Sequence, residues 1–64
     1  MKQDQMIRER IQSKVFEASK KKCRNVFYLT DDGDKSYYCI CGNNNNIFGV
    51  ASVNSKNEIE VILW

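Results

Sequence analysis

Three cysteines are the residues of this chain best suited to chemistry, because a thiolate is both a nucleophile and a metal ligand. Cys39 and Cys41 form a Cys-x-Cys pair, and Cys23 lies sixteen residues upstream of Cys39. A closed zinc site takes four ligands, usually Cys and His, whereas this chain has three Cys and no His. We therefore expect small apolar thiols that are buried or half-buried, with no metal and no other cofactor.

Carboxylates and hydroxyls offer little more for catalysis. The run Asp31-Asp32-Gly33-Asp34 lacks the spacing of a calcium loop, and Asp and Gly are what a hairpin turn requires. Without His, the chain lacks the commonest base that could activate a Cys or Ser nucleophile near neutral pH. The glycines are isolated, so no phosphate-binding loop is present. The sequence predicts a protein that is not an enzyme.

The first third of the chain has the spacing of an amphipathic helix. Ile7, Ile11, Val15 and Ala18 recur at steps of four, four and three, which places them on one stripe. This pattern predicts a helix over about residues 4–22, with the stripe facing the core.

From residue 26 onward the pattern changes to short runs rich in aromatic and β-branched residues, separated by turn residues. These runs predict strands at about 26–30, 36–41, 47–53 and 58–63. The short gaps indicate that consecutive strands pair antiparallel. The expected fold is α+β, with one N-terminal helix packed on a four-stranded antiparallel meander sheet in the order α-β-β-β-β. We expect residues 1–64 to form a single small domain.

The hairpin turns predict which side chains share a face. A turn centred on Asp32-Gly33 would place Tyr28 opposite Tyr37, and alternation then assigns every strand residue to one of two faces. The face towards the helix is expected to contain Phe27, Leu29, Tyr38, Ile40, Phe48, Val50, Ile59, Val61 and Leu63. The other face is expected to contain Val26, Tyr28, Tyr37, Cys39, Cys41, Ile47, Ala51, Val53, Ile62 and Trp64.

One helix covers only one face of a sheet, and the chain has no second helix for the other. An uncovered face is normally polar, whereas this one is expected to carry aromatic and aliphatic side chains, which is typical of a binding surface. The predicted contact residues are Tyr28, Tyr37, Ile62 and Trp64. The alternative is that a twisted sheet curls and buries part of this face.

The resulting hypothesis is a small protein–protein interaction module that docks on another protein or on a second copy of itself. The seven Asn residues are typical of a low-GC genome, so the most concrete version is an inhibitor or regulator from a phage or mobile element.

Binding of single-stranded nucleic acid is the second hypothesis. Tyr28 and Tyr37 would stack on bases, and the basic residues Lys20, Lys21, Lys22 and Arg24 would contact phosphates. The charge balance is +5 over residues 1–24 and −3 over residues 25–64, for a net +2. The acidic second part disfavours nucleic acid as the partner of the sheet.

Neither a signal peptide nor a membrane span is expected. The apolar residues near the start are interleaved with charges, and apolar runs such as Val61-Ile62-Leu63-Trp64 are far too short to span a membrane. An odd number of cysteines excludes a complete disulfide framework. These features predict a cytoplasmic protein without a membrane partner.

Overall fold

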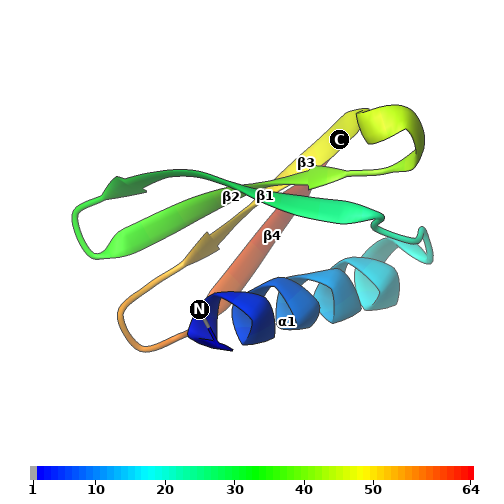
Figure 1. Ribbon diagram of the computed structural model, residues 1–64. Coiled ribbons are helices and arrows are strands. Elements are labelled where there is room, and N and C mark those ends of the chain that lie inside the picture. Colours follow the sequence, from blue (N-terminus) through cyan, green and yellow to red (C-terminus); the bar gives the residue numbers. More distant parts are fainter. Residues whose placement is uncertain (1) are drawn as a thin grey trace.

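The computed structural model describes residues 2–64, and the side chains from residue 5 onward. The elements in chain order are α1 (Lys2–Ser19), β1 (Asn25–Asp32), β2 (Lys35–Cys41), the 3-10 helix η1 (Asn43–Asn45), β3 (Ile47–Val53) and β4 (Ile59–Leu63). The strands form one antiparallel sheet in the order β1-β2-β3-β4. Figure 1 shows α1 lying along one side of this sheet. The predicted α+β class and meander topology are confirmed.

Helix α1 buries the predicted stripe over two of its turns. Ile11 and Val15 are fully buried, and Ile7 packs at the margin of the core, whereas Ala18 is exposed. The helix ends at Ser19 because Lys20 takes a left-handed conformation (φ 61°), and the Lys20 N–H donates to the Phe16 carbonyl at 2.8 Å. The lysine run therefore follows the helix, and the expectation that the helix extends to residue 22 is wrong.

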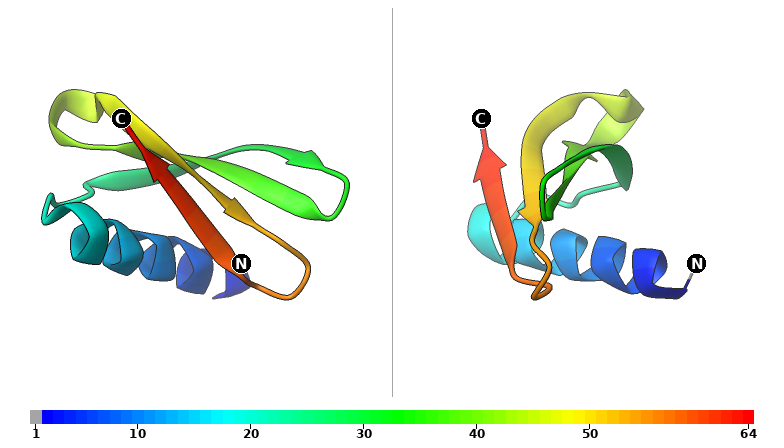
Figure 2. Two further views of the ribbon diagram at one scale, coloured as in Figure 1. Left: turned by 180° about the vertical axis from the view of Figure 1, so that it is seen from behind. Right: turned by 90° about the vertical axis from the view of Figure 1, so that its left-hand side faces the viewer.

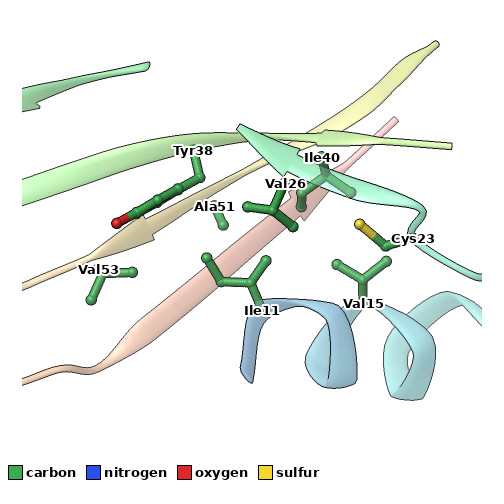
Figure 3. Packing of buried hydrophobic residues seen from close by; sticks show 8 residues of the cluster. All are labelled: Ile11, Val15, Cys23, Val26, Tyr38, Ile40, Ala51 and Val53. Atoms are coloured by element: carbon green, nitrogen blue, oxygen red, sulfur yellow. The ribbon is translucent and has the colours of Figure 1, made fainter. Parts of the chain in front are cut away.

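The hydrophobic core lies between α1 and the face of the sheet towards it (Figure 3). Its buried members come from the helix, the α1–β1 connection and the first three strands: Ile11, Val15, Cys23, Val26, Tyr38, Ile40, Ala51 and Val53. Half-buried side chains that pack around them are Ile7, Phe48, Ile59, Val61 and Leu63. Every strand of the sheet contributes to this layer, so one helix holds the whole sheet.

The register of the first hairpin differs from the prediction. Asp32 pairs with Lys35 across a two-residue turn, and Gly33 in that turn has φ 65°. The turn is thus centred one residue later than expected, because Gly takes positive φ without the steric cost that Asp would incur. A β-bulge at Leu29 follows, and Tyr28 pairs with Tyr38 instead of Tyr37.

The pairing in the last hairpin is displaced by one residue, here without a bulge. Ala51 pairs with Val61 instead of Glu60, so Ala51 and Val53 face the helix and Val50 faces away from it. A one-residue slip exchanges the two faces of a strand. The predicted faces of six residues of β1 and β3 are therefore wrong: Val26, Phe27, Tyr28, Val50, Ala51 and Val53. The predictions for Ile47 and Phe48 agree with the structure. The face predictions for the apolar residues of β2 and β4 agree with the observed pairing.

Phe48 reaches the core in spite of its position next to Gly49 because a second irregularity lies there. The pairing of β2 with β3 shifts between Ile40 and Cys41, which leaves Phe48 as the extra residue. A bulge of this kind redirects a side chain. The Phe48 ring lies over Gly42, where a Cβ would come within 3.3 Å of it.

Candidate docking surface on the outer face of the sheet

The outer face is the side of the sheet opposite α1, and a row of four apolar residues crosses its full width. Phe27, Cys39, Val50 and Ile62 are paired in direct register, one from each strand. Neighbouring strands lie about 4.8 Å apart, so the row is roughly 14 Å long. We call this set the apolar row.

The two ends of the apolar row are exposed to solvent, whereas its two middle residues are buried or half-buried. Phe27 is 44% exposed and Ile62 is 65% exposed, whereas Cys39 is buried and Val50 is half-buried. Both exposed ends belong to edge strands. The twisted sheet therefore buries part of this face, as the alternative reading of the sequence expected, but it leaves large apolar side chains at both ends.

The rows on either side of the apolar row differ in polarity. Tyr37, Ser52 and Glu60 form one flanking row, in which the Tyr37 ring is half-buried and Glu60 is exposed. Cys41 and Ile47 are paired in the other, and Ile47 is 52% exposed. The apolar surface thus continues from the apolar row towards Ile47, and it meets charge on the opposite side, at Glu60.

Hydrogen bonds and a positive-φ residue in the turn between β3 and β4 fix the register of these two strands. In the β3–β4 turn, the Asn54 Oδ1 accepts hydrogen bonds from the N–H groups of Lys56 at 2.9 Å and Glu58 at 3.0 Å. Asn57 in the same turn has φ 63°, a conformation that Asn tolerates better than most residues. Asn54 Nδ2 also donates to the Glu58 carboxylate at 2.7 Å. These bonds fix the position of β4, and with it Ile62.

The loop before β3 is ordered by its asparagines. Asn44 and Asn45 both have positive φ, and the Gly42 N–H donates to the Asn46 carbonyl at 2.8 Å. The Asn25 amide donates to Asn45 Oδ1 at 3.2 Å, which ties the loop to the start of β1. The four consecutive asparagines thus stabilise the loop that precedes Ile47.

All three cysteines are free and buried. The Cys23 thiol donates to the Asn25 carbonyl at 3.2 Å on the helix side, while Cys39 and Cys41 lie on the outer side of β2. Burial raises the pKa of Cys23 and of Cys41, so both thiols stay protonated near neutral pH and are poor nucleophiles. Among the side chains of residues 5–64, no three cysteines or carboxylates gather as metal ligands would.

Tyr28 lies on the helix side of the sheet edge, so its predicted place on the outer face is wrong. Its ring meets the Tyr38 ring edge to face, with centroids 5.8 Å apart and an interplanar angle of 71°. A hydrogen bond to the Asp31 carboxylate raises the pKa of the exposed Tyr28 hydroxyl. Tyr28 and Tyr37 are on opposite faces and cannot form one stacking platform.

The other three predicted contact residues are placed differently from one another. Tyr37 and Ile62 both lie on the outer face. Trp64 follows the end of β4, where its N–H donates to the Phe48 carbonyl at 2.9 Å and its side chain is 69% exposed. The structure therefore brings Tyr37 and Ile62 onto one surface and leaves Trp64 at its margin.

The basic residues of the nucleic-acid alternative lie in the connection between α1 and β1. Lys20, Lys21, Lys22 and Arg24 are all exposed. Lys21, Lys22 and Arg24 line an open groove beside α1, and Glu9 and Glu17 line the same groove. Carboxylates next to the lysines weaken the case for a phosphate site there.

The structure adds Phe27 and Val50 to the outer face, where the sequence analysis did not place them. For Phe27 the turn at Gly33-Asp34 is not a sufficient signal, because that turn alone would pair Phe27 with Ile40 on the helix side. The bulge at Leu29 directs Phe27 to the outer face. For Val50 the corresponding signal is Asn57, which closes a longer turn in the left-handed conformation.

The chain matches no known protein family, and comparisons with curated proteins and with solved structures give no match. In the part of the chain that the structure describes, no helix has the length and hydrophobicity to cross a lipid bilayer.

Proposed function

We propose that this protein is a non-enzymatic binding module that docks on a partner protein through the outer face of its sheet. The observation that carries the proposal is the apolar row, whose two ends, Phe27 and Ile62, are 44% and 65% exposed. Large apolar side chains rimmed by polar residues on an uncovered face favour a protein partner.

The charges near this face suggest the chemistry of the partner. Residues 25–64 carry five acidic and two basic side chains, and Glu60 lies in the row next to the apolar row. A partner surface with an apolar centre and a basic rim would complement it, because complementary charge steers association and fixes orientation. In its most concrete form the module inhibits or regulates an enzyme by covering such a surface.

Introduction of a charge at either end of the apolar row tests the proposal. Phe27→Lys and Ile62→Lys each place a charge within the proposed interface, and we expect each to weaken partner binding at least tenfold, or about 1.4 kcal/mol. Met6→Lys is the matched control, because Met6 is 61% exposed on α1, on the other side of the sheet.

The measurement is capture of cross-linked partners by wild type and the three variants from cells that express the protein. The proposal predicts a partner that is lost with both row variants and kept with Met6→Lys, while circular dichroism shows all three folded. A partner kept by both row variants would place the interface elsewhere. Nucleic-acid binding is less well supported, because Tyr28 and Tyr37 lie on opposite faces of the sheet.

A further inference from the structure

β4 is an edge strand whose outer backbone groups point away from the sheet. The Trp64 N–H donates to Phe48 and the Asn54 N–H donates to Glu58, and the β3–β4 pairing between them has no register shift. Hydrogen-bonded pairs alternate along an antiparallel ladder. Glu60 and Ile62 therefore bond to β3, and the N–H and C=O groups of Ile59, Val61 and Leu63 point outwards.

The side chains of the same three residues are incompletely covered. Ile59, Val61 and Leu63 pack against the core but are only half-buried, whereas the core residues of the inner strands are buried. Figure 2 shows the reason: α1 passes close to the start of β4, and the distance between them grows towards the end of the strand. In the part of the chain that the structure describes, the outward side of β4 is thus unpaired along its backbone and only partly covered by apolar side chains.

The opposite edge of the sheet is protected by comparison. β1 contains a bulge at Leu29 and ends in Asp31 and Asp32, two of the features by which proteins block edge pairing. β4 has no bulge, and Glu60 is the single charge within Ile59–Leu63. Of the two edges, β4 is the one open to another strand.

We propose that β4 pairs antiparallel with β4 of a second copy of this chain, about a twofold axis at Val61. This register joins Ile59 of one copy to Leu63 of the other and brings the outward backbone groups together as bonded pairs. On the outer face, Ile62 lies opposite Glu60 of the second copy, so no like charges are directly opposed. We infer that the partner strand is β4 of a second copy because, in this register, the two edges offer each other matching hydrogen-bond groups and compatible side chains.

The surface area of the chain fits a weak dimer of this kind. A monomer of 7.5 kDa is expected to expose about 4,250 Å², whereas this chain exposes 4764 Å². If each copy covers that excess of roughly 500 Å², the interface totals about 1,000 Å², the lower limit for a specific association. The dimer is therefore reversible and depends on concentration. It uses the sheet edge, whereas docking uses the outer face, and Ile62 is the residue of the apolar row that takes part in both.

Amide hydrogen exchange of the wild-type chain at low and high concentration is the first test. Only unpaired chains exchange the outward amides, so the amides of Ile59, Val61 and Leu63 should slow about tenfold once nine-tenths of the chains are paired. The amides of Glu60 and Ile62, already bonded to β3, should slow much less. Equal exchange of Ile59, Val61 and Leu63 at both concentrations, up to the solubility limit, overturns the proposal.

Matched edge variants provide the second test, with solution mass from light scattering as the readout. Val61→Lys sets two like charges against each other on the twofold axis, and the mass should fall to 7.5 kDa. Tyr28→Lys makes a comparable change at the β1 edge on the same side of the sheet and should leave dimerisation intact. A dimer that survives Val61→Lys but is lost with Phe27→Lys would assign self-association to the outer face and overturn edge pairing.

Discussion

The two faces of the sheet come from the same four strands, yet they differ in what covers them. On the helix side, Ile40 and Ala51 are buried beneath Ile11 and Val15 of α1. On the outer side, Phe27 and Ile62 remain open although both are large and apolar. The difference shows that hydrophobicity alone did not decide burial. The position of each residue relative to the helix and to the edges of the sheet also decided it, since Cys39 in the middle of the outer face is buried and Phe27 and Ile62 on its edge strands are not. The face that the helix leaves uncovered is the candidate docking surface.

Replacement of one isoleucine on each face by alanine should give the largest difference in stability between the two faces. Ile40→Ala leaves a cavity in the covered face and should lower the free energy of unfolding by about 2–5 kcal/mol. Ile62→Ala removes the same atoms from the open face and should cost less than about 1 kcal/mol. Urea denaturation measures both. A domain of this size has little stability to lose. Ile40→Val, which should lower the free energy of unfolding by about 0.5–1.5 kcal/mol, is therefore the milder alternative to Ile40→Ala. Equal costs for Ile40→Ala and Ile62→Ala would mean that the two faces are equally covered.

A glycine on the covered face should show how tightly that face is packed. In Gly49→Ala the new Cβ would lie 2.6 Å from Leu63 Cδ2 and 2.7 Å from the Ile62 carbonyl oxygen. Backbone must move to relieve this overlap, so we expect a loss of about 1–3 kcal/mol in urea denaturation.

Ser52→Ala is the control for Gly49→Ala, since Ser52 lies on the same strand but faces outwards. Its cost should stay within about 0.5 kcal/mol. A neutral Gly49→Ala would show that β4 is not held closely against β3.

Alkaline pH should distinguish the cysteines of the two faces from ordinary surface thiols. Burial raises the pKa of Cys23 on the helix side and of Cys41 on the outer side above the ordinary value of 9.0. The folded state therefore favours the protonated thiols. The stability that they contribute is complete below pH 9.0 and is lost as the pH rises through the folded-state pKa values.

The measurement is the urea midpoint of wild type, Cys23→Ala and Cys41→Ala across this range. Each variant should lose less stability on alkalinisation than wild type, although each starts lower because it leaves a small cavity. Rapid alkylation of Cys41 by iodoacetamide in the folded protein near neutral pH would contradict its burial on the outer face.

By itself, the sequence determined the elements and their order. The spacing of Ile7, Ile11 and Val15 specifies an amphipathic helix, and the Asp-Gly and Asn-rich segments separate β-prone runs, so local pattern suffices for the α+β meander. The absence of a second helix is also visible in the sequence, and it predicts an uncovered face.

Only the tertiary structure decided which residues occupy that face. Side chains alternate with a period of two, so a one-residue change of register exchanges Phe27 with Tyr28 and Val50 with Ala51. The bulge at Leu29 produces that change in the first hairpin, and the turn itself produces it in the last. The position of each turn depends on which residue adopts positive φ, as Gly33 and Asn57 do. The possible turn positions differ little in local energy. Packing against α1 selects among them, because only one register buries Val26, Ala51 and Val53 together.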